Sequence, residues 1–354
     1  MPAASDDQLQ LAWFAALCDD DYEQLGVADP ARLSSFEHCA AIVQAADQGG
    51  FDSILMPSGY SLGIDTVTFT AAIARTTSRI APIVAVRMGE VWLPQLARQL
   101  ATLDQLLDGR LLVNIISSEL PGETLASAPR YQRTLEHMHG LRTLLDGNRL
   151  EADGTFVSLG VDAPRLRTVS GDAPPFYFGG LSPEAREVAA AAADVYLMWP
   201  DTMDGVAAVI ADMRARAARH GRTLRFGYRV HVVVRETEGE ARDAAQHLIA
   251  ALDPDAGEAI RAQSLDSNSV GVRAQASLRD AADMEGFVEP NLWTGIGRAR
   301  SGCGAAIVGN PQQVAEKIRQ YHSLGFDTFI LSGYPHLREC RRFSSLVMPL
   351  LRGA

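Results

Sequence analysis

Lysine is almost absent from this chain. Lys317 is the only lysine among the 32 basic side chains, so a reaction that needs an amine nucleophile or a phosphate-cradling lysine has one candidate. It lies within an amphipathic stretch predicted as a helix, a poor place for either role. The 43 acidic residues give a net charge of −11, which repels phosphate backbones and anionic lipid surfaces. We therefore expect no nucleic acid and no membrane as partner.

Closely spaced cysteines and long apolar runs are also missing. The four cysteines are far apart and show no CxxC or CxxH spacing, so neither a zinc knuckle nor a disulfide framework is predicted: Cys18, Cys39, Cys303 and Cys340. No apolar run approaches the ~20 residues that span a bilayer, and the first residues are acidic rather than basic. These features favour a cytoplasmic protein.

The length and the hydrophobic pattern predict one large barrel. At ~150 residues per domain, 354 residues suffice for two domains or for one α/β barrel. Short runs rich in β-branched and aromatic residues alternate with stretches of helical periodicity, as in a parallel sheet. Eight such units predict a (β/α)8 TIM barrel, a single domain over residues 1–354. The predicted strands are residues 11–17, 51–56, 80–87, 111–116, 176–178, 195–199, 224–234 and 326–331.

Two connections are too long for simple loops. Residues 151–170, after the fourth strand, predict a polar hairpin with its turn at Asp153 and Gly154. Residues 253–309, between the seventh and eighth strands, hold extra helix-forming sequence before Asn310 and Pro311 cap another helix. We expect this second insertion to form a lid. The other predicted helices are residues 36–48, 67–77, 93–107, 131–145, 183–193, 203–220, 238–252 and 337–351.

Polar residues follow the predicted strands, where a barrel of this kind builds its active site. Arg229 and His231 are two apart in one strand and share a face, which is either the barrel interior or the helix layer. A buried arginine needs an anion, either a core carboxylate or a ligand. Tyr334 and His336 follow the last strand and fit an ordinary turn as well as a site.

The turn after the fifth strand is a candidate phosphate site. Gly180, Leu181 and Ser182 precede Pro183 at a predicted helix start, where backbone N–H groups can bind a phosphate. The same pattern also describes any well-capped helix.

Other site motifs are absent. His137 and His139 are two apart on a predicted helix and face different directions, so we expect no metal site there. The Gly302-Cys303-Gly304 segment lacks the third glycine of a dinucleotide fingerprint, and no GxSxG elbow occurs.

Longer segments match the pattern of a known family. They are residues 51–59, 97–99, 101–104, 108–110, 130–131, 177–180, 225–237, 290–293 and 331–337. With these segments the chain resembles the bacterial luciferase-like flavin-dependent monooxygenases, most closely the two-component alkanesulfonate monooxygenases. The resemblance extends from about Trp13 to Leu351, which is nearly the whole chain.

The resemblance implies an enzyme that binds reduced FMN (FMNH2) non-covalently, receives it from a separate NAD(P)H:flavin reductase, and uses O2 through a flavin peroxide. An organosulfonate substrate would give an aldehyde and sulfite. We expect a homodimer or homotetramer. The residues implied around the reacting groups are Arg229, His231, Trp199, Arg300, Tyr334 and His336. Those implied at the flavin are Asn114, Tyr131, Gly180, Leu181 and Ser182. The strand ends add a substrate pocket of Cys18, Asp19, Ser58, Tyr60 and Leu62.

Two positions depart from the alkanesulfonate pattern. Leu62 stands where those enzymes carry a cysteine, and the run Cys18-Asp19-Asp20-Asp21 stands where they carry a histidine. Carboxylates beside an anion site are unfavourable unless they point away.

Alternative functions for the chain are a flavin oxygenase of a sulfone, aldehyde or heterocycle, and a deazaflavin-dependent oxidoreductase. More distant ones are a metal-dependent barrel hydrolase and a non-catalytic scaffold.

Overall fold

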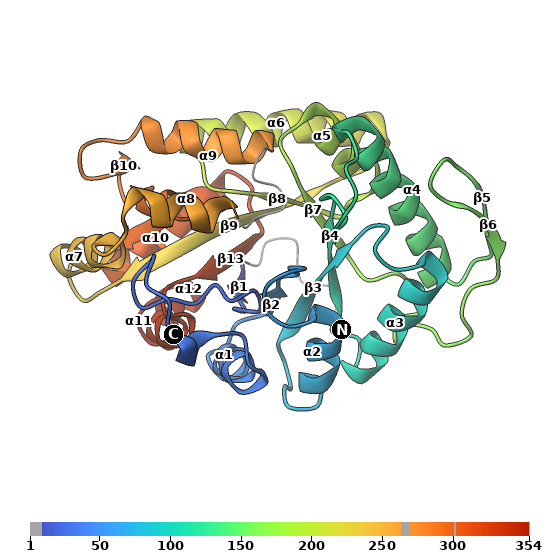
Figure 1. Cartoon of the computed structure of the whole chain (residues 1–354), viewed down its shortest axis with the longest axis horizontal. Coiled ribbons are helices and arrows are strands. Elements are labelled where there is room, and N and C mark those ends of the chain that lie inside the picture. Colours follow the sequence, from blue (N-terminus) through green and yellow to red (C-terminus); the bar gives the residue numbers. More distant parts are fainter. Residues whose placement is uncertain (1–8, 263–268, 301, 354) are drawn as a thin grey trace.

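Eight parallel strands close into a barrel in the computed structural model, which describes residues 9–262, 269–300 and 302–353 (Figure 1). The ring closes because β8 pairs with the first half of β9, and β9 pairs through β13 with β1. The (β/α)8 barrel predicted from the sequence is confirmed. In order around the ring the strands are β1 (Gln10–Phe14), β2 (Ser53–Met56), β3 (Ala81–Arg87), β4 (Leu112–Ile116), β7 (Phe176–Gly179), β8 (Val195–Met198), β9 (Arg225–Val234) and β13 (Thr328–Ser332).

Helices follow the strands and surround the barrel (Figure 1). The stretch 337–351, predicted as one helix, is two, because Pro349 in the first turn of the second helix cannot donate the backbone hydrogen bond that would continue the first. The helices are η1 (Pro30–Arg32), α1 (Phe36–Gln48), α2 (Thr66–Ile73), α3 (Leu93–Leu106), α4 (Ser127–Leu145), α5 (Pro183–Ala192), α6 (Met203–Arg219), α7 (Glu238–Ile249), α8 (Pro254–Ala262), α9 (Val270–Asp280), η2 (Gly295–Arg298), α10 (Pro311–Ser323), α11 (His336–Leu346) and α12 (Met348–Arg352).

Alternation along the strands divides the core into two layers. One small cluster fills the barrel interior and includes Phe14, Leu55 and Ile330, whereas a much larger cluster lies between the strands and the helices. Four side chains of β9 belong to the larger cluster: Phe226, Tyr228, Val230 and Val232. Arg229 and His231 have the opposite parity, so they face the barrel interior rather than the helix layer.

Both long insertions carry secondary structure of their own. The predicted hairpin is present as β5 (Leu150–Asp153) and β6 (Ser158–Val161). The second insertion holds α8, α9, β10 (Phe287–Glu289), β11 (Leu292–Trp293), η2 and β12 (Ala306–Gly309). The sequence analysis missed β12, a four-residue strand that pairs in parallel with the second half of β9. The lid role stays a prediction, and residues 263–268 and 301 of this insertion lie outside the described residues.

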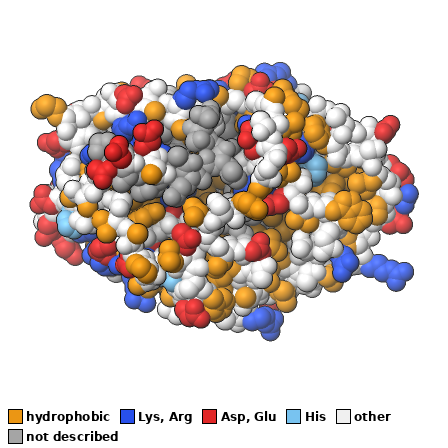
Figure 2. Space-filling model, viewed as in Figure 1, with side chains coloured by type: hydrophobic (Ala, Val, Ile, Leu, Met, Phe, Trp, Pro, Cys, Tyr) orange, Lys and Arg blue, Asp and Glu red, His pale blue; other side chains and the backbone are white. Residues whose placement is uncertain are grey.

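Charged side chains lie mostly on the surface. On the face shown in Figure 2, acidic and basic side chains are interspersed around the rim. Within the described ranges no helix is both long enough and apolar enough to cross a bilayer. Arg229 departs from this distribution, since its side chain is only 5% exposed.

Candidate active site

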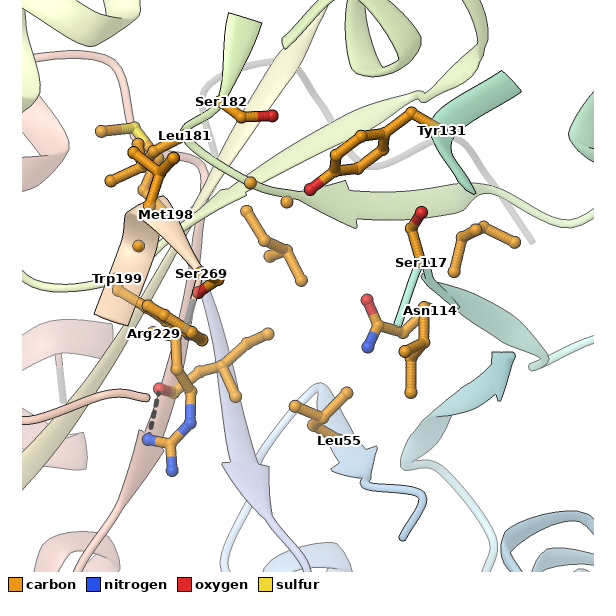
Figure 3. A pocket seen from close by; sticks show the side chains of 18 of the residues that line it. Leu55, Asn114, Ser117, Tyr131, Leu181, Ser182, Met198, Trp199, Arg229 and Ser269 are labelled. Carbon is orange, nitrogen blue, oxygen red and sulfur yellow. Dashed lines mark hydrogen bonds between the residues drawn. The ribbon is translucent and has the colours of Figure 1, made fainter. Parts of the chain in front are cut away.

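A cavity of about 220 Å³ lies at the carboxyl ends of the barrel strands. Its walls come from the end of β4, the start of α4, the loop between β7 and α5, the end of β8, and residues 269–271 of the second insertion. Asn114 and Arg229 face it from opposite sides, and Tyr131 points its hydroxyl toward it (Figure 3). The five residues predicted to bind flavin all line this cavity. Their role in flavin binding stays a prediction.

The loop that leads into α5 is shaped as a cradle. Gly180 has φ +147, and a Cβ there would lie 2.6 Å from the Cβ of Ala185 and 3.6 Å from Tyr131 Oη. Tyr196 Oη donates to the Gly180 carbonyl at 2.6 Å, which holds the loop. The Ser182 hydroxyl accepts from Ala185 N at 3.1 Å and caps α5. The positive end of the helix dipole therefore lies at the cavity, an arrangement suited to a phosphate group.

Arg229 is a buried guanidinium without a carboxylate partner among the described residues. Its Nη1 donates to the carbonyls of Val230 at 3.1 Å and Ile330 at 3.4 Å, and its guanidinium carbon lies 4.3 Å from the centre of the Phe14 ring. Its Nη2 is buried and has no hydrogen-bond partner in the described part of the chain. The core-carboxylate alternative is therefore wrong for the described residues, and Arg229 is free to bind an anion.

Four further residues gather near Arg229 at the ends of β1, β9 and β13. The rings of His231 and Tyr334 stack at 5.2 Å, and the Tyr334 and His336 rings meet edge to face at 5.2 Å. Each residue of this group holds a buried nitrogen or oxygen that lacks a partner within the described ranges. We call this group the polar cluster: Arg229 (Nη2), His231 (Nε2), Tyr334 (Oη), His336 (Nε2) and Asp20 (Oδ1).

The histidines and the tyrosine of the polar cluster are held neutral. Burial lowers the pKa of His231 and of His336, and burial raises the pKa of Tyr334. His336 Nδ1 lies 3.1 Å from the Phe14 carbonyl, which only accepts, so Nδ1 carries the proton and Nε2 is an acceptor. His231 Nδ1 bonds Ser332 Oγ at 2.7 Å.

Arg300 reaches the cluster from the second insertion. It lies between η2 and β12, and its Nη1 donates to Asp20 Oδ2 at 2.9 Å. The pairing of β12 with β9 brings this part of the insertion close to the cluster. At the start of that pairing, His231 N donates a hydrogen bond to the Ala305 carbonyl at 3.1 Å. Arg300 thus ties the insertion to the loop after β1, whereas Arg229 has no such pairing.

Trp199 connects the insertion to the end of β8. It lines the cavity, and a Cβ on Gly271 would lie 2.8 Å from its ring while one on Gly302 would lie 3.2 Å from it. Gln275 is buried in the same region, where it donates to the Pro200 carbonyl at 2.7 Å. Residues without side chains at positions 271 and 302 therefore let the insertion pack against the indole.

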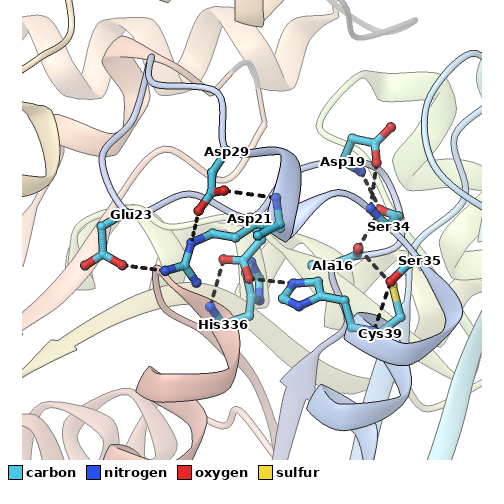
Figure 4. Close-up of polar contacts among 12 residues, drawn as sticks. Ala16, Asp19, Asp21, Glu23, Asp29, Ser34, Ser35, Cys39 and His336 are labelled. Atoms are coloured by element: carbon cyan, nitrogen blue, oxygen red, sulfur yellow. Dashed lines mark hydrogen bonds and ion pairs between the residues drawn. The ribbon is translucent and has the colours of Figure 1, made fainter.

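The residues predicted for the substrate pocket are distributed differently. The Asp19 carboxylate accepts from Ser34 N at 2.8 Å and from Gly63 N at 3.0 Å, so it holds loops together (Figure 4). Ser58 and Leu62 are partly exposed, and Tyr60 is 67% exposed. None of the cavity-lining residues comes from this set. Burial and Asp20 raise the pKa of Cys18 to about 12, which keeps its thiol protonated.

Sequence reasoning also missed residues that the structure brings to the site. Neither Asp20 nor Phe14 is among the site residues predicted from the sequence. Alternation along β1 is a signal that would have placed Phe14 inside the barrel. In the described part of the chain, no three His, Cys, Asp or Glu side chains come together to hold a metal ion.

Comparison with known proteins identifies the family of this chain. The sequence is 60% identical over 352 residues to a sulfoquinovose monooxygenase of Novosphingobium aromaticivorans, covering 98% of this chain and 97% of that protein. A sulfoquinovose monooxygenase of Agrobacterium fabrum is 48% identical over 349 residues, covering 98% and 90%. The solved structure of EDTA monooxygenase from Chelativorans sp. BNC1 shares the fold, with a TM-score of 0.79, 18% identity, and coverage of 98% and 93%. The profile of the luciferase-like monooxygenase family matches residues 12–328, and the chain therefore belongs to that family.

Proposed function

We propose that this protein is an FMNH2-dependent monooxygenase that cleaves the C–S bond of an organosulfonate, and that sulfoquinovose, the substrate in the names of both relatives, is the first candidate. The observation that carries the proposal is Arg229, a buried guanidinium whose Nη2 faces no partner among the described residues. Guanidinium groups bind sulfonate oxygens through charge-assisted hydrogen bonds.

The residues that line the cavity are suited to a flavin mononucleotide. Gly180 to Ser182 and the start of α5 would hold the phosphate, and Leu55, Met198 and Ile330 offer apolar walls for the ring. Asn114 supplies both a donor and an acceptor at the cavity. Reduced FMN supplies the two electrons with which O2 is activated. In the overall reaction one oxygen atom enters the aldehyde and the other leaves as water, while the sulfonate departs as sulfite.

The polar cluster would bind and orient the sulfonate. Arg229 Nη2 and Tyr334 Oη are buried donors, and His231 Nε2 lies beside them. Because His231 and Tyr334 are neutral, Arg229 supplies the positive charge that the anion needs. The second insertion would exclude water when flavin and substrate are bound. It contacts the barrel through Arg300, which pairs with Asp20, and through Gly271 and Gly302, which lie against the Trp199 ring.

A separate reductase would supply the reduced flavin. The sequence has no dinucleotide fingerprint with which the chain itself could bind NAD(P)H. We infer a two-component system in which an NAD(P)H:flavin reductase is the partner, and we expect a homodimer or homotetramer.

Sulfite release tests the function. Purified protein is mixed anaerobically with photoreduced FMN and a sulfonate, then with O2, and sulfite is measured together with the aldehyde. We expect one sulfite per aldehyde from sulfoquinovose, and no sulfite when FMN stays oxidised. FMNH2 binding without sulfite from any of a panel of sulfonates would overturn the organosulfonate assignment and leave a flavin oxygenase of another substrate.

A further inference from the structure

We propose that Asp20 accepts a hydrogen bond from a hydroxyl group of the substrate and thereby sets a preference for hydroxylated over plain alkyl sulfonates. The proposal rests on the organosulfonate function above and gives a role to a carboxylate that the sulfonate itself does not need.

The two oxygens of Asp20 differ. The residue follows β1 and is 7% exposed. Oδ2 accepts from Arg300 Nη1 at 2.9 Å, whereas Oδ1 is buried and has no hydrogen-bond partner among the described residues. A buried acceptor left unpaired is unfavourable, and more so when the group is charged. A donor on a bound ligand would remove that cost.

The neighbouring carboxylates provide an internal comparison. Asp19 is bonded to the backbone N–H groups of Ser34 and Gly63. Asp21 bonds His38 Nε2 at 2.9 Å and accepts from His336 N at 2.9 Å (Figure 4). Both therefore stabilise loops, while Asp20 alone of the three holds an oxygen without a partner in the described part of the chain.

The chemistry of the polar cluster points to a hydroxyl donor. A sulfonate carries only acceptor oxygens, so it can pair with Arg229 Nη2 and Tyr334 Oη. Asp20 Oδ1 and His336 Nε2 are acceptors, and a sulfonate leaves them unpaired. A plain alkyl chain has no donor for them, but a sugar carries several hydroxyls. A site built to bond a hydroxyl discriminates strongly against the analogue that lacks it.

The charges are consistent with this role. Asp20 balances Arg300, with which it forms an ion pair. Arg229 is then left to balance the single negative charge of the sulfonate. The carboxylate therefore lies near the anion site without cancelling the charge that binds the anion.

Asp20→Asn tests the proposal. The amide oxygen can still accept from Arg300, while the amide nitrogen cannot accept from a hydroxyl. We expect kcat/KM for sulfoquinovose to fall about 10- to 100-fold, and kcat/KM for hexanesulfonate to change less than about threefold, both measured as sulfite release. Asp47→Asn is the matched control. Asp47 is also buried and accepts from the backbone N–H groups of Ser78, Arg79 and Ile80, so the change should lower thermal stability without changing the ratio between the two substrates.

Equal losses on both substrates would overturn the proposal, because they are what a residue that only positions Arg300 would produce. If Asp20→Asn does not fold, the wild-type enzyme is assayed with a series of sulfoquinovose analogues that each lack one hydroxyl. For one analogue kcat/KM should then be about 10- to 100-fold lower than for sulfoquinovose. Equal kcat/KM across the series would overturn the proposal. An absence of sulfite from any sulfonate with wild type would instead refute the function itself.

Discussion

The flavin end of the cavity and the polar cluster are built in different ways. At the flavin end several polar groups bond within the protein: Ser182 caps α5, Tyr196 bonds the Gly180 carbonyl, and Ser117 Oγ lies 2.6 Å from Thr134 Oγ1. In the polar cluster, five residues each keep a buried atom without a partner within the described ranges. At the flavin end these internal bonds fix the loop and the cavity wall, whereas the polar cluster needs a ligand to complete its hydrogen bonds.

This difference separates stability from function. Satisfied groups contribute to folding, and replacing them should lower stability as well as flavin binding. Buried unpaired groups cost stability and persist where function requires them. Variants of the satisfied groups at the flavin end should therefore lower the melting temperature, whereas variants in the polar cluster should lower turnover with little change in the melting temperature.

Arg229→Met should give the largest effect. The substitution keeps an unbranched apolar side chain in the cavity wall but removes the charge and the free donor. Because charge-assisted hydrogen bonds are worth about 1.5–3 kcal/mol, kcat/KM should fall about 10- to 100-fold. The melting temperature should change little, because removal of a buried charge with an unpaired Nη2 offsets the loss of the two hydrogen bonds to the Val230 and Ile330 carbonyls. Sulfite assays and thermal unfolding measure the two quantities.

Arg110→Met is the matched control for this arginine. Arg110 is also buried, at 7% exposure, but it lies just before β4 and its Nη1 donates to the Ile80 carbonyl at 2.6 Å. Its loss should cost about 1–3 kcal/mol of stability and leave kcat/KM unchanged. An Arg229→Met protein that melts far below wild type but turns over normally would reverse the comparison between the two ends.

Gly180→Ala should have a smaller effect, which is confined to the affinity for flavin. A Cβ at this positive-φ position would lie 2.6 Å from Ala185 Cβ, so the loop must shift away from its present path. We expect the Kd for FMNH2 to rise about tenfold, which corresponds to about 1.4 kcal/mol. Anaerobic fluorescence titration gives the Kd. Gly171→Ala is the control, because Gly171 also has a positive φ, +86, but a Cβ there meets no atom within 4 Å. Equal Kd values for both variants and wild type would show that this loop does not hold the flavin.

The sequence predicted one end of the site better than the other. The Gly-Gly-Leu-Ser-Pro turn has a local signature, since glycine, an N-cap serine and a first-turn proline report backbone geometry directly. The eight strands were predicted for a similar reason, because a short run rich in β-branched and aromatic residues is a local signal. β12 was missed, since a four-residue strand that ends in Gly309 carries little pattern of its own. Asp20 and Asp19 are adjacent and chemically identical, and only the tertiary contacts with Arg300, Ser34 and Gly63 distinguish them.

His231 offers an effect on stability alone, a change in how the free energy of unfolding depends on pH. Burial holds its pKa well below the ordinary value of about 6.5, so the folded protein binds fewer protons than the unfolded chain between those two values. The free energy of unfolding should therefore fall as pH drops below about 6.5, by up to about 1.4 kcal/mol per pH unit for this one group. His231→Gln keeps a hydrogen-bonding side chain near Ser332 and removes the titration, so its slope should be shallower in denaturant unfolding between pH 7 and 5. His247→Gln, at an exposed position, is the control. An identical slope in wild type and His231→Gln would mean that His231 takes up its proton in the folded protein as readily as in the unfolded chain, and that this end of the site is wetter than its burial indicates.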